Sequence, residues 1–97
     1  MKLNLIHTAI DERNAAPNQI NIEAYDLYEK MSKCDVVLVK FKDRDKLLIA
    51  CPSCGVASFT GNHKITNDHG VFTANPSLVM NCCGWHGWLK NNEFVST

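Results

Sequence analysis

Two short cysteine-containing segments carry the residues whose types and spacing could support chemistry. The first is Cys-Pro-Ser-Cys-Gly at residues 51–55, and the second is Cys-Gly-Trp-His-Gly at residues 83–87. Two ligands separated by two residues at a tight turn can direct both donor atoms to one ion, and three cysteines with one histidine complete a closed tetrahedral zinc site. The sequence therefore predicts one structural zinc ion per chain, bound by Cys51, Cys54, Cys83 and His86.

Two adjacent cysteines make the second segment ambiguous, because either Cys82 or Cys83 could pair with His86. Cys83 has the two-residue spacing of the first segment and is followed by Gly84. We therefore take Cys83 as the ligand and Cys82 as a thiol at the end of a strand. Cys34 is expected to pack as a small hydrophobic residue.

The cysteines do not fit a disulfide framework, since their number is odd and two of them are adjacent. Charge appears at Asp11, before an apolar segment is long enough for a secretory signal. We therefore expect a cytoplasmic protein, in which thiols bind metals or take part in redox chemistry. Apolar runs are also too short for a membrane span.

Three other uses of these residues are chemically possible. Cys-Pro-Ser-Cys resembles a thioredoxin-type motif, but that chemistry needs a helix after the first cysteine, and residues 56–60 indicate a strand. Residues 83–88 are similar to the second half of a Rieske motif, so a 2Fe-2S cluster stays the alternative cofactor, although the first half lacks its histidine. Zinc-hydrolase and deaminase motifs are missing. An enzyme is therefore not the favoured interpretation.

The remaining sequence predicts short elements around these segments. Residues 1–19 indicate a strand or arm followed by a loop, residues 21–33 an amphipathic helix, and residues 63–70 a polar loop. Pro76 must lie at a strand edge or start because it cannot donate to a ladder. Strands are expected at 35–42 and 46–50, joined by a polar turn, and at 56–60, at 71–73, and in a closing hairpin of 88–90 and 94–95 around Asn91-Asn92.

These elements define an α+β, mainly β fold: a small antiparallel zinc-ribbon-like or Rieske-like β domain preceded by one short helix. The 97 residues suit a single domain, 1–97, with an N-terminal arm and helix over 1–34 and the zinc-binding β domain over 35–97. A chain this short is near the limit of independent stability. A structural zinc ion can add on the order of 10 kcal/mol to folding.

Charge and surface residues bear on the partner. Ten acidic and ten Lys or Arg residues leave a formal net charge of zero, which disfavours nucleic acid and favours a protein partner. His63 and His69 lie in the predicted loop and are not expected to bind metal. Trp85 and Trp88 flank His86, and packing around the site is expected of both, although one of them could be exposed. Candidate contact residues of a binding surface are Tyr25, Tyr28, Arg44 and Trp88.

Residues from about 47 to 95 resemble an uncharacterised family of small bacterial and phage proteins. The resemblance is carried by the segment at 51–55, by Asn-Pro-Ser-Leu at 75–78, by Cys-Gly-Trp-His-Gly-Trp-Leu at 83–89 and by the turn at 91–94. It implies a zinc-ribbon-like or Rieske-like fold and no established activity. It also implies a phage or mobile-element protein in the host cytoplasm. We expect a non-enzymatic protein-interaction module. An iron–sulfur electron-transfer or redox protein and a nucleic-acid-binding zinc ribbon are the alternatives.

Overall fold

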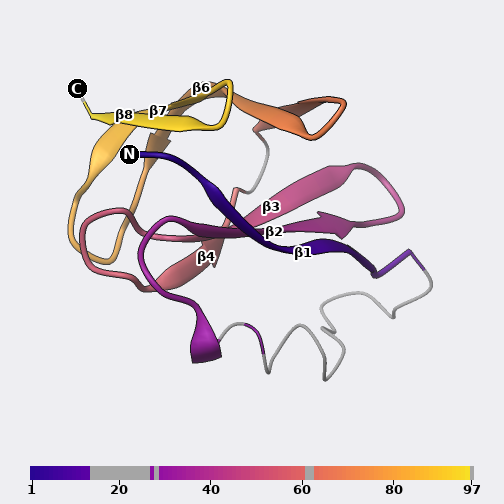
Figure 1. Ribbon diagram of the computed structural model, residues 1–97, viewed down its shortest axis with the longest axis horizontal. Coiled ribbons are helices and arrows are strands. Elements are labelled where there is room, and N and C mark those ends of the chain that lie inside the picture. Colours follow the sequence, from indigo (N-terminus) through magenta and orange to yellow (C-terminus); the bar gives the residue numbers. More distant parts are fainter. Residues whose placement is uncertain (14–26, 28, 61–62, 97) are drawn as a thin grey trace.

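Two four-stranded β-sheets make up the computed structural model, which describes residues 1–13, 27, 29–60 and 63–96. The sheets have the strand orders β1-β2-β3-β4 and β5-β6-β7-β8 and lie one above the other (Figure 1). The strands are β1 (Asn4–Asp11), β2 (Asp35–Lys40), β3 (Asp45–Ala50), β4 (Ala57–Phe59), β5 (Lys64–Asp68), β6 (Val71–Val79), β7 (His86–Lys90) and β8 (Glu93–Ser96). The predicted mainly β fold class is confirmed.

The predicted helix over residues 21–33 falls mostly outside the described residues. Leu27, Glu29 and Lys30 are helical, and the chain is no longer helical at Met31. Residues 21–26 and 28, which include both tyrosines proposed as contact residues, lie outside the described part. Among the described residues, no helix is long and apolar enough to cross a membrane.

The β2–β3 hairpin occupies the middle of its sheet and confirms the predicted hairpin. Val37 pairs with Leu48 in an antiparallel register. Val36 packs with the other sheet, whereas Val37 belongs to a second buried cluster on the opposite face. Burial on both faces explains why these strands are almost continuously apolar, since each successive side chain needs an apolar neighbour.

The N-terminal strand β1 joins β2 in a parallel pair, so the sheet is mixed where only antiparallel pairing was expected. Before β1, the chain lies along the other sheet: Lys2 forms a bridge with Glu93, and the Leu3 N–H donates to the Asn92 carbonyl at 2.8 Å. The first residues therefore connect both sheets. Parallel strands need a long connection, which residues 12–34 provide.

The polar segment 63–70 is a strand and a turn, so the prediction of a loop is wrong. Residues Lys64–Asp68 form β5 and pair with β6. The turn that follows has positive φ at His69 (52°) and Gly70 (88°), as a tight hairpin requires. Because β5 is an edge strand with most side chains exposed, it lacks the apolar alternation that identifies a half-buried strand.

Strand β6 is longer than predicted, and Pro76 lies within it. Its pairing with β7 shifts between Ala74 and Leu78, which face Leu89 and Gly87. Three residues of β6, 75–77, thus lie opposite one residue of β7, Trp88, and a proline without an N–H is tolerated at such a bulge. The expected position of Pro76 at an edge or strand start is corrected accordingly.

The closing hairpin of β7 and β8 is confirmed. Asn91 and Asn92 connect the strands with φ of 50° and 64°. Asparagine is among the few residues that readily adopt this left-handed conformation.

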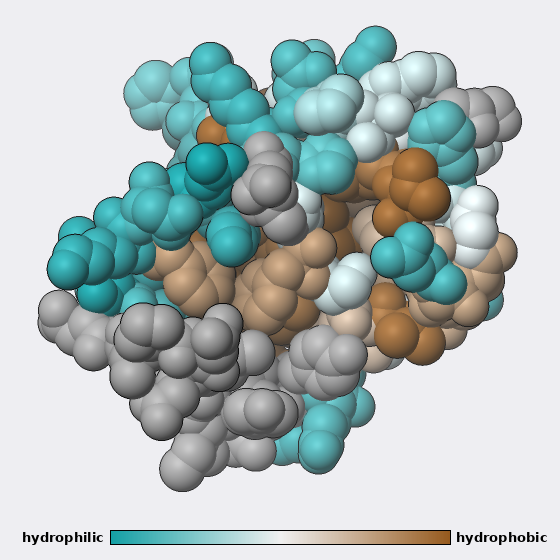
Figure 2. All heavy atoms as spheres, turned by 180° about the vertical axis from the view of Figure 1, so that it is seen from behind, coloured by the Kyte–Doolittle hydropathy of each residue, from teal (hydrophilic) through white to brown (hydrophobic). Residues whose placement is uncertain are grey.

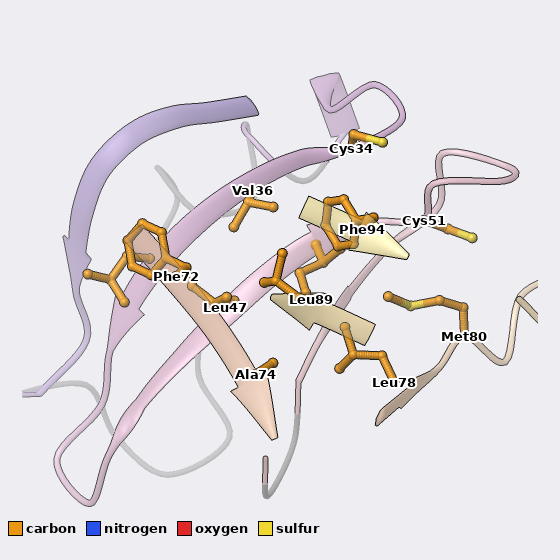
Figure 3. Close-up of a cluster of buried hydrophobic side chains, with 12 residues drawn as sticks. Cys34, Val36, Leu47, Cys51, Phe72, Ala74, Leu78, Met80, Leu89 and Phe94 are labelled. Carbon is orange, nitrogen blue, oxygen red and sulfur yellow. The ribbon is translucent and has the colours of Figure 1, made fainter. Parts of the chain in front are cut away.

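The core between the sheets draws on both of them. Figure 3 shows its side chains, with Phe72, Leu89 and Phe94 from one sheet facing Val36 and Leu47 of the other. Seen from behind, hydrophilic side chains cover most of the upper part, where sheet β5–β8 lies, and apolar ones gather lower down (Figure 2). The buried cluster consists of Cys34, Val36, Leu38, Leu47, Ile49, Cys51, Phe72, Ala74, Leu78, Met80, Leu89 and Phe94.

Candidate metal centre

The first turn (residues 51–56) connects β3 to β4. The Cys51 N–H donates to the Val56 carbonyl, and the Gly55 N–H donates to the Cys51 carbonyl, both at 2.9 Å. Gly55 has φ of 85°, which a side chain would strain. The turn places the buried Cys51 at the end of β3 and Cys54 at the surface.

The second turn (residues 80–85) connects β6 to β7 and has the same hydrogen-bond pattern. The Met80 N–H donates to the Trp85 carbonyl, and the Gly84 N–H donates to the Met80 carbonyl, both at 2.8 Å. Gly84 has φ of 79°. In this repeat Met80 takes the position of Cys51, and Cys83 that of Cys54.

The repeat therefore lies three residues earlier than the one predicted from spacing, which matched Cys83 and His86 to the two cysteines of the first turn. The signal in the sequence is the glycine that directly follows Cys54 and Cys83. This glycine marks the fifth position of each turn, because only there does the backbone need positive φ.

Four cysteine sulfurs meet where the two turns lie side by side, at the left of Figure 1. We call Cys51, Cys54, Cys82 and Cys83 the sulfur cluster, and their Sγ atoms all lie within 4.8 Å of one another. The Sγ–Sγ distances are 3.0 Å for Cys54–Cys82, 3.5 Å for Cys51–Cys83 and 3.9 Å for Cys82–Cys83. Sulfurs about 2.3 Å from one zinc ion would be about 3.8 Å apart, so this donor set fits a single tetrahedral ion.

His86 lies outside the sulfur cluster, at the start of β7. Its Nε2 is 3.1 Å from the Ser77 Oγ, and its ring is 6.4 Å from that of Trp88. The structure thus brings together Cys51, Cys54 and Cys83 of the predicted set, and with them Cys82 rather than His86.

Hydrogen bonds shift the pKa values of two cluster thiols in opposite directions. The Trp85 N–H donates to Cys83 and, with a contact from Cys51, lowers the pKa of the Cys83 thiol to about 7. The contact of Cys82 with Cys54, whose sulfurs are 3.0 Å apart, raises the pKa of the Cys82 thiol to about 12, together with desolvation. A dication that neutralises several neighbouring thiolates would displace the remaining protons.

The other candidate residues lie apart from the cluster. Cys34 is buried between the sheets, as expected, with its Sγ 4.0 Å from the Met1 Sδ, and burial raises its pKa. His63 contacts the carbonyl oxygens of Thr60 and Ser77, and the exposed His69 lies 2.8 Å from Asp68.

The two tryptophans differ in environment. Trp85 packs against the core and meets Phe94 edge-on, with ring centroids 6.1 Å apart. Trp88 is 36% exposed on the outer face of the sheet, with the Lys90 Nζ 5.5 Å from its ring centroid. Trp88 is therefore available for contact with another molecule.

Comparison with protein-family models, with curated proteins and with solved structures found no match to this chain. The family resemblance of residues 47–95 therefore stays a prediction.

Proposed function

We propose that this protein is a small non-enzymatic binding module whose two sheets are cross-linked by one zinc ion at Cys51, Cys54, Cys82 and Cys83. The observation that carries the proposal is the meeting of four sulfurs from two turns, each of which belongs to a different sheet. The ion would add a link between the sheets to those made by the core and by the first residues.

The donor set supports zinc in a structural role. Four thiolates saturate a tetrahedral ion and leave no position for water or substrate, unlike catalytic sites, which keep one open. Such a centre stabilises the fold by an amount comparable to the whole net stability of a small domain. The exposed working surface is then separate from the metal.

An iron-containing centre is the second candidate, because four thiolates also hold iron. A Rieske-like cluster receives less support than a single ion. It needs histidine ligands on one of its two irons, whereas His86 contacts Ser77 and the cluster holds sulfur at single-ion spacing.

For the partner we propose a protein. The formal net charge of zero gives nucleic acid no general attraction. The family resemblance supports a phage or mobile-element origin, with a host protein as target and the host cytoplasm as location.

Elemental analysis of protein purified in air tests the metal centre. We expect about one zinc per chain and a colourless solution, since one tetrahedral site takes one ion. A red-brown protein that contains iron and acid-labile sulfide would show that the site holds an iron–sulfur cluster instead of zinc. Folded protein that contains no metal and whose four cluster thiols all react with a thiol reagent would refute the metal centre.

A further inference from the structure

A shallow hollow of about 490 Å³ lies on the outer face of sheet β5–β8, away from the sulfur cluster. It spans three neighbouring strands, β5, β6 and β7. We call it the outer groove, and it is lined by Lys64, Thr66, Thr73, Ala74, Asn75, Trp88, Lys90 and Asn91.

The bulge in β6 explains why this face is hollow. Lys64 pairs with Asn75, and Thr66 pairs with Thr73, so the first two strands are in regular register. Beyond Ala74 the register with β7 shifts, and β6 departs from the regular ladder opposite Trp88. On its β6 side the indole thus has an open flank, whereas on the β8 side Trp88 pairs with Val95.

Charge in the outer groove is of one sign. Two lysines line it and no acidic residue does. Among the described residues, neither ammonium forms an ion pair. The nearest acids of the same sheet have other partners, since Asp68 contacts His69 at 2.8 Å and Glu93 contacts the N-terminal ammonium at 3.5 Å.

Two more acids, Asp43 and Asp45, share a separate hollow with Lys64 on the other side of β5. They are at the tip of the β2–β3 hairpin and do not line the outer groove. On a chain whose total charge is zero, the outer groove is therefore a local positive site, and a complementary ligand is anionic.

Polar and aromatic groups complete the surface. Two threonine hydroxyls and the Asn75 amide offer hydrogen bonds, and the exposed Trp88 ring offers a large apolar contact. Tryptophan is among the residues most often found at binding hot spots. A ligand that satisfies all of these groups has carboxylates at its ends, a polar backbone and an apolar middle.

We propose that the outer groove binds an extended acidic segment of a protein partner, with Trp88 packing against its middle and Lys64 and Lys90 each holding one carboxylate. This inference rests on the proposed binding role and names the partner surface. Two ammonium groups suit a pair of carboxylates, whereas a nucleic-acid strand would need a longer basic path.

Strand geometry gives the spacing of the acidic residues. Lys64 and Lys90 lie two strands apart, about 9.6 Å, and are offset by about two residues along the strands, about 6.8 Å, which places them about 12 Å apart. An extended peptide rises about 3.3 Å per residue. The carboxylates should therefore be three or four residues apart, with proline or an aromatic residue between them.

Titration of the ¹⁵N-labelled zinc-containing protein with the capped peptide Gly-Glu-Pro-Tyr-Glu-Gly tests the proposal. We expect shifts of the Trp88 indole N–H and of the amides of β5 and β6, and weaker binding at high salt. The glutamine version, Gly-Gln-Pro-Tyr-Gln-Gly, should bind at least ~10-fold more weakly. Trp88→Ala should weaken binding ~10- to 30-fold, as expected for a hot spot.

Charge reversal tests the two lysines of the outer groove, and the same change at a lysine elsewhere is the matched control. The double variant Lys64→Glu, Lys90→Glu should weaken binding at least ~10-fold, whereas Lys30→Glu, an exposed lysine next to the other sheet, should not change it. Equal binding of the two peptides, or no shift at Trp88, would overturn the proposal. So would tighter binding of an eight-nucleotide oligothymidylate through the same residues, which would make this a nucleic-acid surface.

Zinc content measured on every sample separates the two proposals. A zinc-loaded, folded protein that does not bind the acidic peptide refutes only the outer groove. A metal-free protein that binds it refutes only the zinc centre.

Discussion

Cys82 lies in the second turn at a position that is occupied by Ser53 in the first turn. The position of the second turn that matches Cys51 is occupied by Met80, a buried thioether that cannot ionise. Thiolates, not thioethers, are the usual zinc ligands. Cys82 thus provides the fourth ionisable sulfur of the cluster from two positions further along the same turn.

This arrangement predicts that a cysteine at residue 80 can replace Cys82 as the fourth zinc ligand. Cys82→Ser should lower zinc affinity at least ~100-fold, because only three sulfurs remain. Adding Met80→Cys to that variant should restore stoichiometric zinc, since residue 80 has the place that Cys51 has in the first turn. Zinc content after dialysis against a chelator and the melting temperature are the measurements.

His86→Ala is the matched comparison for these variants, and it should keep its zinc because His86 lies on Ser77 outside the sulfur cluster. If His86→Ala loses zinc and Cys82→Ser keeps it, the centre has the Cys51, Cys54, Cys83 and His86 ligands that the spacing predicts.

At the scale of elements, the hairpin of β7 and β8 depends on close backbone packing at one glycine. Gly87 lies in β7 opposite Ser96, directly after His86. A Cβ at this position would meet the Val95 carbonyl oxygen and lie 2.7 Å from the Trp85 ring. The glycine lets the two strands and the indole approach each other, and its conservative replacement therefore tests the packing of the whole hairpin.

Gly87→Ala should lower the free energy of unfolding by about 3 kcal/mol, at the upper end of the range for overpacking, because a carbonyl cannot move aside as a flexible side chain can. Urea denaturation measures the change. Gly70→Ala is the control: it has positive φ but no atom within 4 Å of its Cβ, so it should cost only about 1 kcal/mol of backbone strain. Equal effects of the two substitutions would show that the contact at Gly87 is relieved.

At the scale of the whole molecule, the shared core and the first three residues join the two sheets, and the sulfur cluster brings together one turn of each sheet. The core lies along the middle of the sheets, with Cys51 and Met80 at one end of it (Figure 3). A metal ion at the cluster would close this end of the interface. Its removal should act on both sheets, not on one turn alone.

Removing the metal with a chelator should therefore lower the melting temperature by at least about 20 °C, because several kcal/mol are lost and each is worth about 4–8 °C in a domain of this size. Amide exchange should rise in both turns and at the adjoining ends of β3 and β7. Zinc should reverse the change and magnesium should not. An unchanged melting temperature after proven metal loss would exclude a stabilising role.

Local patterns were sufficient for part of this structure. Alternation and β-branching predicted the β2–β3 hairpin, and Asn91-Asn92 predicted the closing turn, because each depends on neighbours in the sequence. The cysteine segments predicted that two turns would carry sulfur to one place. Three of the four sulfurs found together were among the predicted ligands.

Long-range contacts decided the rest. The strand β5 has no apolar pattern of its own and exists through pairing with β6, and β1 lies parallel to β2 because the chain returns after a long connection. Whether Cys82 or His86 lies near the other three sulfurs depends on which way the chain leaves the second turn. Strand pairing of β7 directs His86 to Ser77, and this is a property of the sheet, not of the spacing between two ligands.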